Sequence, residues 1–300
     1  MSDTGKPIPV TGDKHVLFAY VLGILGVVGF GATLPATRIA LADFTPEFLT
    51  FARAAIATAM AAAVLLWYRK PLRHSHNFQI FLAGTFLIFG FPGFMSVAMQ
   101  TVPAAYGGVV LGFLPLTTAI IARLLTEEKP SGLFWILSIS GCVIVTGYIL
   151  AKAGPDTTSG DWPGYGWLVL AGLTASVGYV IFGKLSRKTA GWEIISRSLV
   201  LNMPLTIIGL IWFFDRSFVD PSMPGLSALL YLGSVSMFLA FCAWNAALAM
   251  GGIARIGQLQ LLQVFVTIAL SALLLAEHLD VLTIAAATLI TIVIAASRKV

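Results

Sequence analysis

Long apolar segments separated by short polar ones recur along the whole chain. A helix needs about 20 apolar residues to cross the hydrocarbon core of a bilayer, and backbone without internal hydrogen bonds cannot face lipid. The pattern therefore predicts an all-α integral membrane protein with ten transmembrane helices. They cover residues 16–39, 47–67, 78–98, 103–124, 132–150, 164–183, 191–213, 226–247, 256–276 and 281–297. Glycine and proline at 26–32, 89–93 and 250–252 are expected to permit bending.

The composition agrees with a lipid environment. Apolar residues make up 58% of the chain and charged residues 10%, whereas charged residues form about 25% of soluble domains. The net charge of +5 does not predict nucleic-acid binding, because the basic residues lie in short clusters between apolar segments. Cys142 and Cys242 lie inside apolar segments and the histidines lie near loops or termini, so we expect neither a metal nor a cofactor.

Lysine and arginine set the predicted orientation in the membrane. With the N-terminus in the cytoplasm, thirteen of the eighteen basic residues fall on the cytoplasmic side and three, Arg38, Lys152 and Arg216, on the outer side. Arg53 and Arg197 lie within spans. The bias predicts a multi-pass protein of a bacterial inner (cytoplasmic) membrane with both termini in the cytoplasm. The polar N-terminal segment lacks the pattern of a cleavable signal peptide.

A polar segment at 151–163 divides the spans into two sets of five. We therefore expect a cytoplasmic tail at 1–15, a first repeat at 16–150, the linker at 151–163 and a second repeat at 164–300. Because five is odd, the second repeat enters the membrane in the opposite direction, which makes the two inverted repeats.

Two pairs of positions support the internal repeat. LPLTTAIIARLLTEE (114–128) and QVFVTIALSALLLAE (263–277) share four of fifteen columns, including the final Glu128 and Glu277. Arg53 and Arg197 each lie six residues into the second span of their repeat. A charge within a span is costly, so its recurrence at one depth in both halves indicates a common origin.

Three segments resemble the EamA-type transporters of the drug/metabolite transporter superfamily, which include bacterial amino-acid and metabolite exporters. They are GFGATLPATRIAL with TPEFLTFARAAIA (29–41 and 45–57), FMSVAMQTVPAAYGGVVLGFLPLTTAIIARLLTEEKP (94–130), and LLYLGSVSMFLAFCAWNAALAMGGIARIGQLQLLQVFVTIALSALLLAEHL (229–279). The resemblance implies a carrier of small metabolites, often amino acids. One departure is that the family's proline, present as Pro115, aligns with Val264 in the second half.

Substrates of such carriers bind near the midplane between the repeats. Polar or aromatic residues at that depth are expected to contact substrate, because an unpartnered polar group in lipid is costly. The candidates are Gln258, Gln260 and Gln263, whose amides suit a zwitterion, with Thr33, Tyr179, Trp244 and Asn245, and with Gln100 and Tyr106 at an outer mouth. Hydrogen bonding or packing between helices is the alternative role for the residues within spans, and anchoring at the membrane interface is the alternative for Gln100 and Tyr106.

Five further residues are expected to serve structure or gating. Arg53 and Arg197 are expected to reach toward the nearer membrane surface, with Glu193 pairing with Arg197 one helical turn away. Attraction of a substrate carboxylate is the alternative for both arginines. Glu128 and Glu277 are expected to organise loops at helix ends, and Pro115 to bend the fourth span.

The sequence thus predicts a secondary transporter that exports amino acids by alternating access around a central cavity. A nucleotide-sugar or phosphorylated-metabolite exchanger, a multidrug exporter and a channel are the alternatives. An enzyme is disfavoured, because acids and histidines lie near span ends or in loops. For the same reason we expect no buried carboxylate to carry a coupling proton. The expected partners are a small-molecule substrate and the lipid bilayer; a monomer is compatible with the pattern.

Overall fold

The computed structural model describes residues 13–72, 75–125, 132–152, 161–186, 189–251 and 256–297. Every regular element in these ranges is helical. The first half contains α1 (Asp13–Gly31), α2 (Thr33–Ala40), α3 (Pro46–Trp67), α4 (Asn77–Gly84), the π-helix η1 (Thr85–Gly90), α5 (Phe91–Ala98), α6 (Ala104–Leu111), α7 (Leu114–Leu125) and α8 (Gly132–Lys152).

The second half is also built of helices, but they are interrupted partly at other places. It contains α9 (Asp161–Ser186), α10 (Gly191–Leu201), α11 (Met203–Trp212), the 3₁₀ turn η2 (Arg216–Val219), α12 (Met223–Tyr231), the π-helix η3 (Leu232–Leu239), α13 (Ala240–Gly251), the 3₁₀ turn η4 (Gly257–Leu261), α15 (Leu262–Leu275) and α16 (Val281–Ser297).

Six continuous helical segments are long and apolar enough to cross a membrane: Val16–Ala40, Pro46–Trp67, Asn77–Ala98, Trp135–Lys152, Trp162–Ser186 and Met223–Gly251. Two bent pairs, α6 with α7 at 40° and α10 with α11 at 48°, raise the number to eight if each pair is one span. The apolar helices Leu259–Leu275 and Val281–Ala296 are shorter. The described part of the chain is therefore a multi-pass membrane protein with six to eight spans by length and composition.

Proline and glycine account for many of the breaks between helices. Pro115 and Pro204 are each the second residue of a helix that follows a break, and Pro92 is the second residue of α5, which continues directly from the π-helix η1. Proline lacks an N–H and clashes with the preceding turn, so it fits the first turn of a helix and not its interior. The glycine-containing segments 26–32, 89–93 and 250–252 likewise coincide with the ends of α1, η1 and α13.

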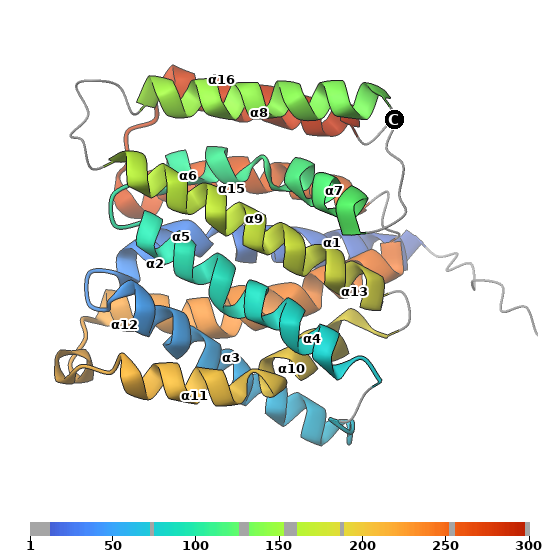
Figure 1. Cartoon of the computed structure of the whole chain (residues 1–300), viewed down its shortest axis with the longest axis vertical. Helices are drawn as coiled ribbons and strands as arrows, with labels where there is room; N and C mark the ends of the chain where they lie inside the picture. Colours follow the sequence, from blue (N-terminus) through green and yellow to red (C-terminus); the bar gives the residue numbers. More distant parts are fainter. Residues whose placement is uncertain are drawn as a thin grey trace, which may run out of the picture.

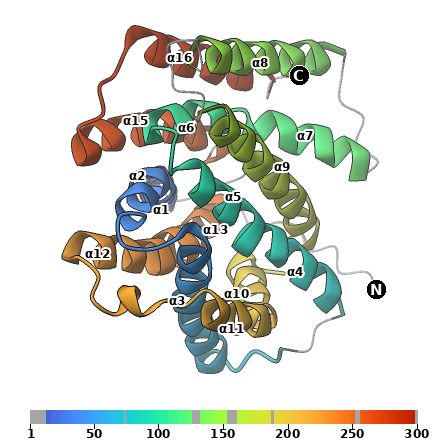
Figure 2. The ribbon, with the colours of Figure 1, turned by 60° about the vertical axis from the view of Figure 1, so that its left-hand side comes forward.

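The packing joins corresponding helices of the two halves. α3 packs against α10 and α11, α6 against α15, and α8 against α16. Between these pairs, α1 packs on α13 and α15, while α9 packs on α5 and α7. Figures 1 and 2 show α8 and α16 side by side at one end of the molecule, with α3, α10 and α11 at the other. Helices of both halves therefore form each end of the molecule, and α1, α5, α9 and α13 lie between these two ends.

The π-helices also occupy corresponding places. η1 begins eight residues after the start of α4, and η3 begins nine residues after the start of α12. π-Helical turns are rare and frequently occur at functional sites. Because η1 lies in the third predicted span and η3 in the eighth, residues that contact these π-helices are candidates for a functional site.

Candidate functional site

Arg53 on α3 contacts the second π-helix through a network of hydroxyl groups. Its Nη2 donates a hydrogen bond to Oγ of Ser236 on η3 at 3.2 Å. The same Ser236 Oγ lies 2.7 Å from Oγ1 of Thr33 at the start of α2. Thr33 and Ser236 are buried, and Arg53 is only 3% exposed. Two consecutive helices of the first half, α2 and α3, therefore meet the distant η3 at one buried guanidinium group.

This guanidinium lacks most of its hydrogen-bond partners. Nε and Nη1 of Arg53 are buried and have no acceptor, and within the described residues no carboxylate forms an ion pair with Arg53. The side chain of Arg53 is enclosed by protein where it meets Ser236, and its expected reach toward the nearer membrane surface stays a prediction.

The break between α1 and α2 lies beside this group. A helix leaves its last four carbonyls without intrahelical partners. Tyr231 Oη donates to the Gly29 carbonyl at 2.9 Å, and Thr267 Oγ1 donates to the Gly31 carbonyl at 2.9 Å. Hydroxyl groups from the eighth and ninth predicted spans thus satisfy the end of α1. The sequence analysis did not select Tyr231, Ser236 or Thr267 as site residues; the signal available was a polar group within an apolar segment.

Arg197 on α10 has a different environment although it holds the corresponding place in the second half. Its Nε and Nη2 donate to Oε1 of Glu193 at 3.1 and 2.6 Å, as the helical spacing predicts. Lys70 Nζ lies 3.1 Å from Oε2 of the same Glu193. Arg197 is also 3% exposed, but its charge is balanced within the protein. Only the Nη1 atom of this guanidinium lacks a partner.

The glutamines of the ninth predicted span lie at the junction of η4 and α15. Gln260 is in η4 and Gln263 is the second residue of α15, and both side chains are half-buried. Neither side-chain amide makes a hydrogen bond within the part of the chain that the structure describes. Their amides are therefore available to a ligand. Gln258 also lies in η4, but its side chain is outside what the structure describes.

Three other substrate-binding candidates, Tyr179, Trp244 and Asn245, lie on α9 and α13. Tyr179 on α9 is half-buried beside the cluster that includes Leu87 and Phe238. Trp244 on α13 packs against the small buried cluster of Ala19, Ala247 and Ile256. Asn245 Nδ2 donates to the Phe241 carbonyl of its own helix at 2.8 Å, and its side chain packs against Gly191. Tyr179 and Trp244 thus have packing partners, while Asn245 has its amide nitrogen bound locally.

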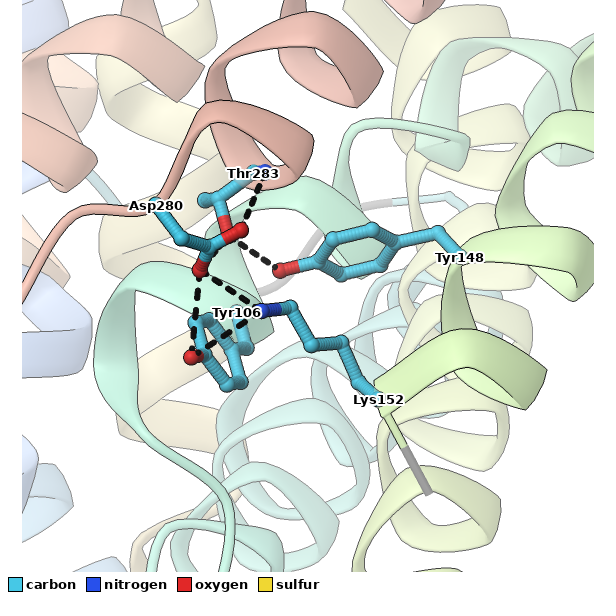
Figure 3. Close-up of polar contacts among 5 residues, drawn as sticks. All are labelled: Tyr106, Tyr148, Lys152, Asp280 and Thr283. Atoms are coloured by element: carbon cyan, nitrogen blue, oxygen red, sulfur yellow. Dashed lines mark hydrogen bonds and ion pairs between the residues drawn. The ribbon is translucent and has the colours of Figure 1, made fainter. Parts of the chain in front are cut away.

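The two outer candidates differ from each other. Gln100 is exposed just after α5. Tyr106 Oη donates to Asp280 Oδ2 at 3.2 Å and accepts from Lys152 Nζ at 3.2 Å, with Tyr148 and Thr283 completing the cluster (Figure 3). The structure therefore supplies Tyr106 with partners that join α6 to α8 and to the start of α16.

Glu277 is bound to the start of a helix in the other half. Its Oε1 and Oε2 accept hydrogen bonds from the backbone N–H groups of Ala104 and Ala105, both at 2.8 Å. Arg38 Nε lies 4.0 Å from Oε1. Ala276 adopts a left-handed conformation, with φ of 51°, that turns the chain at the end of α15. Glu277 thus caps α6, in agreement with the expected role at a helix end.

Of the two remaining candidates for a structural or gating role, Pro115 and Glu128, the structure describes Pro115. Pro115 is the second residue of α7 and follows the 40° bend of the fourth predicted span. Its counterpart Val264 lies in α15, which continues without a break from Leu262 to Leu275. Glu128 lies outside the described residues.

Two apolar grooves lie elsewhere on the molecule. One of about 410 Å³ is lined by residues of α7 and α8, including Trp135, Cys142 and Thr146. The other, of about 340 Å³, lies between Phe51, Phe89 and Trp212. None of the described candidate residues lines either groove. Among the described residues, no three His, Cys, Asp or Glu side chains could hold a metal ion together.

Comparison with known proteins identifies the family of the chain. The profile of the EamA-like transporter family matches residues 17–151 and again residues 162–297. An uncharacterized transporter, YdeK of Bacillus subtilis (strain 168), is 37% identical over 281 residues, which cover 93% of this chain and 96% of that protein. The chloroplastic WAT1-related protein At3g02690 of Arabidopsis thaliana is 24% identical over 268 residues, covering 84% of this chain and 63% of that protein.

A protein of known crystal structure has the same fold. It superposes with a TM-score of 0.65 at 21% identity and covers 94% of this chain and 98% of its own length. Two consecutive matches to one family, together with a relative similar over nearly the whole chain, are decisive. The chain belongs to the EamA-like transporter family of the drug/metabolite transporter superfamily and is a membrane transporter.

Proposed function

We propose that this transporter exports small metabolites, specifically amino acids, by alternating access between two inverted five-helix repeats. The observation that carries the proposal is the pairing of corresponding helices, α3 with α10, α6 with α15 and α8 with α16. Two related units that contact each other through the same elements enclose a path along their common axis. Rocking of one unit against the other would open that path to each side in turn.

Contacts between helix ends support a topology of ten alternating spans. At the proposed outer face, Glu277 caps α6, Lys152 pairs with Asp280, and Asp43 accepts a hydrogen bond from Ser222. At the proposed cytoplasmic face, the end of α3 meets the start of α10 through Lys70 and Glu193. Each contact joins ends that ten alternating spans would place on one face. The bent pairs and the shorter helices α15 and α16 would complete the ten.

The unpartnered amides of Gln260 and Gln263 support a polar solute. An amide both donates and accepts hydrogen bonds, so two of them on one helix face suit a molecule that carries both kinds of group. We place these residues, with Tyr179 and Trp244, around the substrate. A nucleotide sugar or phosphorylated solute would need more cationic groups than Arg53 provides, the one buried arginine among the described residues without an ion-pair partner. We place the protein in a bacterial inner membrane with both termini in the cytoplasm, on the distribution of basic residues.

Uptake by proteoliposomes tests the proposal. Purified protein is reconstituted and supplied with radiolabelled amino acids and, separately, with amphipathic drugs. Saturable uptake and counterflow of amino acids would support a carrier, whereas non-saturating flux would indicate a channel. Drug transport without amino-acid transport would favour the multidrug alternative. Uptake that persists after collapse of the proton gradient would agree with the absence of an acid in the middle of any predicted span.

Substitutions at the glutamines test the site. Gln260→Leu and Gln263→Leu are each expected to raise the KM for the transported amino acid about tenfold, because one ligand hydrogen bond is worth about 1.5 kcal/mol. Gln79→Leu is the matched control, since Gln79 is exposed on α4. Unchanged transport in the two site variants would remove both glutamines from the substrate-binding region.

A further inference from the structure

The two arginines in corresponding places of the repeats differ in how their charge is balanced. Arg197 has Glu193 at hydrogen-bond distance, and Lys70 binds the same carboxylate. Arg53 has the hydroxyl oxygen of Ser236 as its acceptor, with Nε and Nη1 unpartnered. Both side chains are equally buried. The first half of the protein therefore contains a positive charge without the negative partner that the second half supplies.

An arginine in this condition is energetically unfavourable. The guanidinium group remains protonated in proteins, so it cannot escape the cost of burial by losing its charge. A buried charge without a partner costs several kcal/mol, and a charge inside a membrane-spanning segment is expensive on every scale. Such a group is expected where an anion joins it during function.

The surroundings of Arg53 place polar groups and a helix break beside the guanidinium. By helical rise, Arg53 lies about 10 Å below the start of α3, within the hydrocarbon core of about 30 Å. The end of α1 and the start of α2 meet beside it, and η3 provides the Ser236 hydroxyl. Broken helices near the middle of the membrane commonly form the substrate sites of secondary transporters. Ser236 accepts a hydrogen bond from Arg53 and forms another with Thr33, so it fixes the orientation of the guanidinium.

We propose that Arg53 binds the carboxylate group of the transported solute, with Ser236 and Thr33 holding the guanidinium in place. This inference rests on the proposed function and adds the chemical class of the substrate. Arginine matches a carboxylate because its N–H donors can bind both oxygens. The glutamines of η4 and α15 remain for the other polar groups of the solute. Solutes without a carboxylate, such as amines and amino-acid amides, are bound weakly.

Thermal unfolding of the purified protein tests the inference without a transport assay. Arg53→Met removes the uncompensated charge and leaves Ser236 paired with Thr33, so the ligand-free variant is expected to melt at a higher temperature than the wild type. Arg197→Met is the matched contrast: it leaves Glu193 without its closest partner and is expected to lower the melting temperature. Arg53→Lys is the second variant: it retains the positive charge and can be tested if Arg53→Met folds poorly.

The response to ligand completes this experiment. Neutral amino acids are expected to raise the melting temperature of the wild type, and their α-carboxamides are not. The Arg53→Met variant is expected to lose this response, while Arg53→Lys retains part of it. A full response in Arg53→Met would overturn the inference, as would an equal response of the wild type to sodium chloride, which would assign the group to an inorganic anion. A lower melting temperature of ligand-free Arg53→Met would also overturn it, since Arg53 would then be a structural residue.

Uptake by proteoliposomes separates this inference from the proposed function. The wild type is expected to prefer amino acids over their α-carboxamides, and Arg53→Met to lower uptake of the amino acids about tenfold or more. Uptake of the carboxamides by the wild type at the rate of the amino acids would contradict the inference alone. Absence of uptake of every solute tested would contradict the proposed transport function itself.

Discussion

The ammonium group of Lys152, the last residue of α8, lies 2.6 Å from Oδ2 of Asp280, the residue before α16. Lys152 also lies 4.4 Å above the ring of Tyr106 on α6. Thr283 donates to Asp280 from both its backbone N–H and its hydroxyl, at 3.0 and 2.8 Å. Because α8 and α16 pack mainly against each other at one end of the molecule (Figure 1), this cluster is a polar tie between them and the central helices.

The Asp280 cluster makes stability depend on acidic pH. Burial raises the pKa of Asp280, but hydrogen bonds from Lys152 and Thr283 outweigh that effect and hold the pKa at about 2, against 3.8 for an unperturbed group. A lowered pKa in the folded state stabilises the protein above about pH 4, and this contribution is lost as the pH falls toward 2. With the side chain of Asp280 36% exposed, we expect the loss to be about 1 kcal/mol.

Melting temperatures between pH 5 and pH 2 measure this effect. Asp43 and Asp215 also have lowered pKa values, through hydrogen bonds from Ser222 and Ser217, so the wild type is expected to lose stability from several groups. Asp280→Asn is expected to melt lower at pH 7 and to show a shallower decline on acidification. A parallel decline in both proteins would show that Asp280 does not contribute.

Glu277 is expected to be a strong determinant of stability because it satisfies two backbone donors at the start of α6. Glu277→Ala leaves the N–H groups of Ala104 and Ala105 without acceptors and is expected to cost about 1–3 kcal/mol. Glu277→Gln keeps one acceptor oxygen and is expected to cost less. Thermal unfolding ranks the stability of the two variants and the wild type. Faster hydrogen exchange at the N–H groups of Ala104 and Ala105 would show that the loss of stability arises at the start of α6. Equal stability of alanine variant and wild type would contradict the capping role.

The ion pairs around Glu193 are expected to be unequal in strength. Glu193→Gln leaves the buried Arg197 without a counter-charge and is expected to destabilise the protein by about 3–5 kcal/mol. Lys70→Met removes a partner that is 40% exposed, and the expected cost is below about 1 kcal/mol. The double variant Glu193→Leu with Arg197→Met removes both charges and is expected to be more stable than Glu193→Gln. If the double variant were at least as unstable as Glu193→Gln, the uncompensated charge of Arg197 would not be the cause of the instability of Glu193→Gln.

Much of the fold followed from local properties of the sequence. Apolar segments locate helices because hydrophobicity is a property of each residue and its neighbours, and Pro115 and Pro204 fall where helices restart because proline acts on its own backbone. The short α15 and α16 depart from the expectation of ten full spans. Their apolar segments are bounded by the 3₁₀ turn η4 and by the loop that carries Glu277, features with no hydropathy signal.

The site was less accessible from the sequence, because its contacts join residues far apart in the chain. Arg53 and Arg197 appear equivalent in sequence, and their environments differ through Ser236 and Glu193, of which only Glu193 is local. The sequence could not show the partners of Tyr106, because Lys152 and Asp280 lie 46 and 174 residues away. Its place at an outer mouth stays a prediction. Periodicity shows which residues share a helix face, but not which helix that face meets.

Close contact between α9 and the third predicted span allows a matched test of packing within one helix. A methyl group at Gly178 would meet the side chain of Leu87 in η1 and lie 3.2 Å from the Ala83 carbonyl in α4. A methyl group at Gly183, five residues further along α9, would meet nothing within 4 Å. Gly178→Ala is therefore expected to destabilise the protein by about 1–3 kcal/mol through overpacking. Gly183→Ala is expected to be neutral or to stabilise by up to about 1 kcal/mol, since alanine favours helix.

Because both variants make the same chemical change in one helix, helix propensity contributes equally to each. The difference between their melting temperatures isolates the contact with η1. If transport requires α9 to move against the π-helix, Gly178→Ala is expected to lower the rate of counterflow in addition to stability, while Gly183→Ala leaves it unchanged. Equal melting temperatures would show that Leu87 moves aside without cost, and the close approach of α9 to η1 would then not restrict the residue at position 178.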